Sequence, residues 1–239
     1  MNLKIIHRSS SIWNIIVFTL LSIFFLFAQD AIIHDKSALN FLYLKAFIIN
    51  SKFLVGFTLF TIISIFSMRK SSRYLYSLQA ACIIGLIIKD LFYDFDKFII
   101  LMLFIYILFS YYFYILLSLE LKRAFVNPGF STNELFDPML KKIKCTLTLK
   151  DEQFEGYLSN WDEYSCFMSL KLLQNPTERT GRLVIFYDDH EFSQSAQVAT
   201  MALGYGVGVK FLAEDNNLFN WNEFNKIIND LGFNVEYLK

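Results

Sequence analysis

Four long apolar segments, separated by short polar connections, dominate the first half of the chain. They cover residues 12–28, 46–68, 74–93 and 98–119. A helix of about 20 mostly apolar residues spans the hydrocarbon core of a bilayer. The first and third segments are shorter or interrupted, but they are still too long and continuous for core strands. We therefore predict four transmembrane helices within residues 1–123.

The second half changes to the two-residue alternation of half-buried strands. In residues 142–149, apolar side chains alternate with lysine and threonine. Further runs follow at residues 153–159, 164–171, 182–187, 191–202 and 206–213. Short strands at this spacing are typical of a small antiparallel barrel.

The last apolar pattern of the chain predicts an amphipathic helix at residues 221–231. Asn220 and Glu223 form an N-cap pair, and Gly232 supplies a C-terminal stop. The apolar stripe of this helix consists of Trp221, Phe224, Ile227, Ile228 and Leu231.

The predicted fold class is therefore a membrane α region plus a cytoplasmic all-β domain. Residues 1–123 form the four transmembrane helices, and residues 124–140 form a linker that contains Pro128-Gly129 and Pro138. Residues 141–239 form a six-stranded antiparallel β-barrel with a C-terminal helix.

Composition and charge support this division. The chain is 55% apolar, with 27 phenylalanines and a net charge of zero. Residues 1–123 carry 12 Lys/Arg and 6 Asp/Glu, whereas residues 124–239 carry 10 and 16. Basic residues flank one side of the apolar segments, at Lys4, His7, Arg8, Arg69, Lys70, Arg73, Lys122 and Arg123. The positive-inside rule then predicts an inner-membrane protein with both termini in the cytoplasm. Its cysteines are expected to remain free thiols.

Three ionisable residues lie within the apolar segments: Lys52, Lys89 and Asp90. All are expected near the outer helix ends, where lysine can reach the interface. We interpret them as anchoring residues, and an ion or substrate role is the alternative. No charge is expected at mid-membrane, and no pair of Gly/Pro-broken helices occurs. Helices without internal polar machinery favour an anchor or a partner-binding bundle over a transporter.

A glycine-rich stretch, GYGVGVKFL at residues 204–212, closes the predicted strand region. From the residues alone we expect Gly204, Gly206 and Gly208 to have a structural role, because glycine within a strand marks a bulge or a close backbone approach. The stretch, with the strand order and C-terminal helix around it, resembles the PilZ domain family. The resemblance is confined to the soluble half.

PilZ domains that bind cyclic di-GMP use an RxxxR motif before the first strand and a (D/N)xSxxG turn between the second and third strands. By this resemblance the turn falls on residues 160–165. Asn160 matches its first position, but Asp162 replaces serine and Ser165 replaces glycine. Asp162 and Glu163 thereby bring negative charge to the place where a dianionic ligand would lie.

The arginine motif is absent from its expected place, since no arginine lies between residues 124 and 178. Lysine lacks the planar fork with which arginine holds phosphates. The soluble half is also net acidic, so no broad field attracts an anion. The basic candidates that remain are Arg123, Lys141, Lys142 and Lys144. We therefore expect cyclic di-GMP binding to be reduced or lost.

The resemblance implies an inner-membrane-anchored adaptor or structural subunit of a bacterial surface machine, in motility, pilus, secretion or exopolysaccharide systems. It would act by contact with other membrane or cytoplasmic proteins, with Trp161 and Tyr164 as contact residues, and a homo-oligomer is compatible with this. The alternative is a membrane-bound cyclic di-GMP receptor with an atypical lysine-based site.

Two other classes of function are disfavoured by the soluble half. We expect no enzyme, because the soluble half shows no nucleophile–base pair and no metal-ligand spacing around its single histidine, His190. The acidic balance argues against nucleic-acid binding.

Overall fold

The computed structural model describes residues 4–93, 95–126, 143–150, 152–170, 178–212 and 220–230. They form two compact units, one from Ser9 to Leu121 and the other from the residues up to Arg8 and from Lys122 onward. The helices of the first unit are α1 (Ser10–Ile33), α2 (Phe41–Asn50), α3 (Lys52–Phe66), α4 (Ser72–Tyr93) and α5 (Lys97–Lys122). The elements of the second unit are β1 (Lys4–Ile5), the short 3-10 helix η1 (Ala124–Val126), β2 (Lys144–Leu149), β3 (Glu152–Asp162), β4 (Ser165–Ser169), β5 (Thr180–Tyr187), β6 (His190–Ala202), β7 (Gly206–Phe211) and α6 (Trp221–Asp230).

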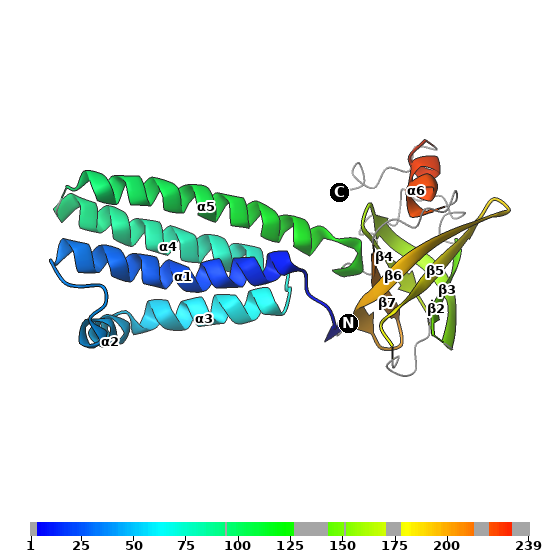
Figure 1. Ribbon diagram of the computed structural model, residues 1–239, viewed down its shortest axis with the longest axis horizontal. Coiled ribbons are helices and arrows are strands. Elements are labelled where there is room, and N and C mark those ends of the chain that lie inside the picture. Colours follow the sequence, from blue (N-terminus) through cyan, green and yellow to red (C-terminus); the bar gives the residue numbers. More distant parts are fainter. Residues whose placement is uncertain are drawn as a thin grey trace. The chain divides into compact units, whose positions relative to one another are not determined.

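In the helical unit, α1, α3, α4 and α5 lie side by side, and α2 crosses one end (Figure 1). Three of these helices, α1, α4 and α5, are each long and apolar enough to cross a membrane. The pair α2 and α3 passes the same test together, but it is bent by 81°. The described part of the unit therefore offers three spans, or four if the bent pair is one span, which is consistent with a membrane protein.

The predicted second helix, residues 46–68, is not continuous. It is interrupted at Ser51, which ends α2 with φ −96° and ψ 22°. Asn50 and Ser51 are poor helix formers, because their short polar side chains compete for backbone hydrogen bonds. The apolar run alone did not reveal this break.

The interior of the helical unit is mainly aromatic and aliphatic, but it also contains polar groups. Phe18 of α1 stacks on Phe113 of α5, with 4.5 Å between ring centroids. Buried Gln79 of α4 donates through Nε2 to Thr58 Oγ1 of α3 at 3.1 Å. The expectation of an interior without polar groups needs this correction. Such interhelical hydrogen bonds help helices associate in apolar surroundings.

The three ionisable residues of the apolar segments lie near helix ends. Lys52 is the first residue of α3, and its Nζ lies 5.5 Å from the ring centre of Phe53. Lys89 and Asp90 lie near the C-terminal end of α4, where Lys89 is exposed and Asp90 is half-buried. Their anchoring role stays a prediction.

Strands β2 to β7 form a closed antiparallel barrel in the order β6-β5-β2-β3-β4-β7, which the β6–β7 pairing closes. This confirms the predicted six-stranded barrel, and only the strand ends differ from the expected ones. Asp188 and Asp189, with φ of 48° and 58°, make the tight connection between β5 and β6 that the sequence predicts. His190 begins β6 directly after this turn.

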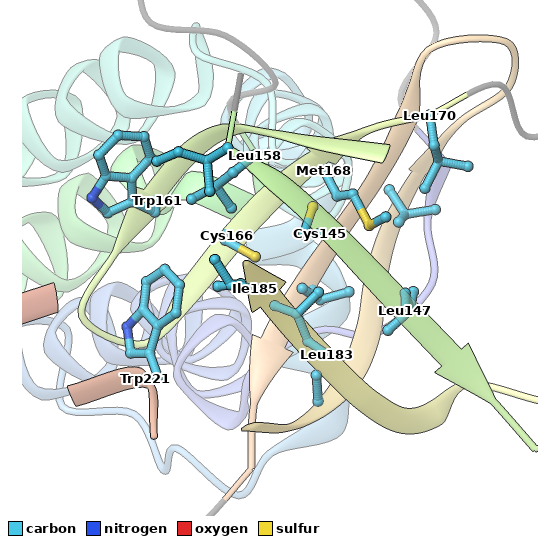
Figure 2. Packing of buried hydrophobic residues seen from close by; sticks show 14 of the residues in the cluster. Cys145, Leu147, Leu158, Trp161, Cys166, Met168, Leu170, Leu183, Ile185 and Trp221 are labelled. Atoms are coloured by element: carbon cyan, nitrogen blue, oxygen red, sulfur yellow. The ribbon is translucent and has the colours of Figure 1, made fainter. Parts of the chain in front are cut away.

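Alternate side chains from the strands fill the barrel interior. Figure 2 shows Cys145 and Leu147 of β2 directed toward Leu183 and Ile185 of β5 and toward Cys166 of β4. Each of these side chains is at most 1% exposed. This arrangement follows from the period-2 pattern, which places every second residue on the inner face.

Helix α6 confirms the predicted C-terminal helix. Asn220 Oδ1 accepts a hydrogen bond from the Glu223 N–H at 3.2 Å, as expected of an N-cap. Ile227 is 37% exposed and lies at the edge of the stripe. Leu231 and Gly232 lie outside the described residues. The side chains that α6 adds to the barrel core are Trp221, Phe224 and Ile228.

The N-terminal strand β1 was not expected from the sequence. Ile5 pairs with Thr200 of β6. The N–H groups of Ile6 and His7 then donate to the carbonyl of Ala199 at 2.8 and 3.0 Å. Residues interpreted as the flank of a transmembrane helix thus belong to the barrel unit.

Candidate interaction site at the β3–β4 turn

The candidate site is built around the tight connection between β3 and β4. β3 ends at Asp162 and β4 begins at Ser165, which leaves Glu163 and Tyr164 as the turn. Asp162 Oδ1 accepts a hydrogen bond from the Tyr164 N–H at 2.8 Å, as aspartate often does at the start of a turn. The predicted turn at residues 160–165 is therefore too wide, because its first three residues belong to β3.

A register shift in β3 determines which side chains of this stretch point into the barrel and which point outward. Pairing with β4 slips between Leu158 and Asn160. Leu158 and Trp161 point into the barrel, so that Asn160 and Asp162 lie on the opposite face. Trp161 is only 2% exposed and lies in the core (Figure 2). This position does not fit its predicted role as a surface contact residue.

The residues that follow α5 dock on this opposite face as η1. The Ala124 N–H donates to Asp162 Oδ2 at 2.7 Å. The Ser165 hydroxyl donates to the same oxygen, also at 2.7 Å. Ala124 and Ser165 are 1% and 0% exposed, so water cannot replace this acceptor easily. The Asp162 carboxylate therefore fixes the start of η1 on the turn.

Arg123 adds a cation at the same corner. Its guanidinium lies 3.7 Å from Asp162 Oδ1, and its Cζ lies 4.7 Å from the ring centre of Tyr164. The side chains of Arg123 and Asp162 are 30% and 17% exposed, so solvent screens the ion pair. A hydrogen bond to Glu163 and the negative charge of that carboxylate raise the pKa of the Tyr164 phenol.

Phe125 completes the docked segment and is fully buried. Its carbonyl accepts a hydrogen bond from the buried hydroxyl of Thr200. The Nζ of Lys210 lies 5.8 Å from its ring centre. Gly208 lies beneath it, and a Cβ there would clash with the Phe125 carbonyl and the Thr200 hydroxyl. The expected structural role of Gly208 is thus confirmed as a close approach of two backbones.

One row of paired residues forms the surface that η1 covers. Asn160 pairs with Phe167, Phe167 with Gly208, and Gly208 with Thr200. Phe167 is 1% exposed, although it does not belong to the interior cluster. Its burial fits the packing of η1 against β3, β4, β6 and β7. We call this row, together with Asp162 and Ser165 at its turn end, the η1 face.

Two of the chain's three cysteines, Cys145 and Cys166, lie in the barrel interior. All three are free. Burial raises the pKa of the Cys145 thiol to about 12 and that of the Cys166 thiol well above its usual value. Both stay protonated at neutral pH, so neither is a ready nucleophile. In the described ranges, no group of three or more His, Cys, Asp or Glu is placed to hold a metal ion.

The structure brings together part of the predicted nucleotide site. The residues that meet at the η1 face are Arg123, Asn160, Asp162 and Ser165. Lys144 instead lies exposed on β2, between β3 and β5. Lys141 and Lys142 lie outside the described residues. Tyr164, predicted to contact a partner, is 51% exposed at the turn.

Sequence reasoning missed Ala124, Phe125 and Thr200 as members of the site. One signal was present: Gly208 in the middle of a strand indicates that another backbone approaches it. A second was Phe125, a large apolar residue at the start of the predicted linker. Neither signal identifies the other as its partner.

Comparison of the sequence with models of known protein families and with curated proteins finds no significant match.

Proposed function

We propose that the chain is a PilZ-like adaptor or structural subunit of a bacterial surface machine of the motility, pilus, secretion or exopolysaccharide type. It is anchored in the inner membrane and acts by protein–protein contact. It crosses the membrane four times, with α2 and α3 as one broken span and both termini in the cytoplasm. This orientation is supported by the basic residues before α1, between α3 and α4 at residues 69–73, and at the end of α5.

The observation that carries the proposal is the occupied η1 face. A nucleotide at the β3–β4 turn would have to displace Ala124 and Phe125 from their buried contacts. Its phosphates would meet the carboxylates of Asp162 and Glu163, and Arg123 is already paired with Asp162. Like charges at short range oppose binding. The exposed part of the turn, with Tyr164, suits contact with a protein.

Affinity purification of the intact protein from its native membrane tests this proposal. We expect a stable complex with other membrane proteins, whereas a lone monodisperse monomer would contradict it. Tyr164→Ala should lower the yield of partner. Tyr157→Ala is the matched control, because Tyr157 is 47% exposed on the same strand pair and should leave the yield unchanged.

A second candidate function is a cyclic di-GMP receptor, since Arg123 and Ser165 both contact Asp162 at the turn and Asn160 lies on the same face of β3. Calorimetry must use the intact chain, because a fragment that starts at residue 124 would lack both Arg123 and β1. Saturable heat that Arg123→Ala abolishes would support the receptor. Absence of heat at high micromolar nucleotide would exclude it.

A further inference from the structure

η1 contacts the barrel in the way that a bound peptide contacts its receptor. It uses a main-chain donor (the Ala124 N–H) and a main-chain acceptor (the Phe125 carbonyl). The side chains of Phe125 and of the preceding Arg123 make two further specific contacts. In peptide recognition, main-chain hydrogen bonds provide affinity and sites for individual side chains provide specificity. We propose that the η1 face is a peptide-binding groove, occupied by the chain's own residues 123–126. In their place it accepts a partner segment with an arginine two residues before a large apolar residue.

The turn end of the groove selects arginine. Asp162 supplies a carboxylate and Tyr164 supplies an aromatic face, and Arg123 contacts both. A planar guanidinium pairs with a carboxylate and stacks on an aromatic ring at the same time, which an ammonium group does less well. Because this corner is partly exposed, an incoming arginine can reach it while Arg123 is still in place.

The other end selects a large apolar side chain after a small residue. Phe125 is fully buried over Gly208, beside Lys210. Ala124, between the two anchors, is 1% exposed, so that a larger side chain there would have to fit among buried neighbours. We therefore expect the groove to accept a segment of three consecutive residues: an arginine, a small residue and a large apolar residue.

The chain's own residues 123–126 also regulate access to the groove. A tethered ligand acts at an effective concentration in the millimolar range, so a partner segment binds weakly until η1 leaves. η1 is short, and the corner at Arg123 that precedes it is partly exposed. Release can therefore begin at this corner without unfolding of the barrel. The existence of a partner rests on the proposed adaptor function, but the groove itself can be tested without that partner.

The test measures binding of a fluorescent peptide of residues 121–127 to the full chain in detergent micelles. In the Arg123→Ala/Phe125→Ala variant, residues 123–126 of the chain lack both anchoring side chains. We expect this variant to bind the peptide at least about tenfold more tightly than the wild type does. Adding Gly208→Ala should abolish binding and adding Asp162→Asn should weaken it. Adding Glu155→Gln, a charge-matched control at an exposed position of β3 away from the turn, should change nothing.

The proposal is overturned if the double variant, with native Trp161 fluorescence, does not bind the peptide, or if Gly208→Ala leaves binding intact. If the double variant does not fold, hydrogen exchange on the wild type decides. The Ala124 amide should exchange at least about tenfold faster than the amides paired between β6 and β7, since η1 opens locally. Equal rates would show that η1 does not leave the groove. Either failure leaves the co-purification test of the adaptor function unaffected.

Discussion

Replacing Asp162 by alanine tests whether this residue acts on η1 mainly as a hydrogen-bond acceptor or as a charge. The change leaves the Ala124 N–H and the Ser165 hydroxyl without their acceptor, and both residues are at most 1% exposed. A buried donor without an acceptor costs about 1–3 kcal/mol. Two such donors are left here, but the turn can partly relax. Asp162→Ala should therefore lower the free energy of unfolding by about 2–4 kcal/mol. Arg123→Ala removes a solvent-screened ion pair and a contact with the half-exposed Tyr164 ring, and should cost about 1 kcal/mol.

Urea unfolding of the full chain in detergent micelles measures these differences. Trp161 and Trp221 are both buried in the barrel unit, so their emission should shift to longer wavelength as this unit unfolds. Glu163→Ala is the control, because Glu163 is exposed in the same turn and its removal should change the stability little.

The double variant Arg123→Ala/Asp162→Ala separates the two roles. We expect a coupling energy of no more than about 1 kcal/mol between the residues, with most of the Asp162→Ala effect retained in the absence of Arg123. If Arg123→Ala alone costs as much as Asp162→Ala, or if the coupling energy equals the whole effect, Asp162 acts on η1 as a charge and not mainly as a hydrogen-bond acceptor.

Three further outcomes follow from the barrel core and the helical unit. Phe224→Ala, which empties a fully buried site, should lower stability by about 3–5 kcal/mol in the same urea assay. Because the pKa of Cys145 is raised to about 12 and that of Cys166 is also raised, the folded state holds protons that the unfolded thiols lose. Stability should therefore be unaffected by these thiols below about pH 8.5, and should fall by about 1.4 kcal/mol per pH unit per thiol above it, until the folded thiols ionise. Cysteines introduced at Ser37 and Ser71 should be labelled by an impermeant maleimide from opposite sides of the membrane, and labelling from one side would contradict four spans.

Most of the fold could be predicted because its signals are local. Each apolar run or two-residue alternation determines an element by itself, and the barrel strands and α6 lie close to their expected positions. The exceptions depend on a few residues within a run. Ser51 interrupts a helix that the apolar composition predicts as continuous. The register shift at Ser159 turns the Trp161 side chain into the barrel.

The candidate site could be predicted only in part, because its contacts are long-range. Thr200 and Phe125 are 75 residues apart, and Asp162 and Ala124 are 38 apart. The sequence identified the turn and named Arg123 as a candidate. It could not show that Arg123 docks there on a carboxylate, because that contact depends on the closed barrel and on the approach permitted by Gly208.

Photo-crosslinking from position 164 in intact native membranes tests the central claim most directly. With p-benzoylphenylalanine in place of Tyr164, we expect a discrete adduct with a second protein. The same group in place of Tyr157, which is similarly exposed, should give none. No adduct at position 164, or equal adducts at both positions, would contradict a protein-binding role for the β3–β4 turn.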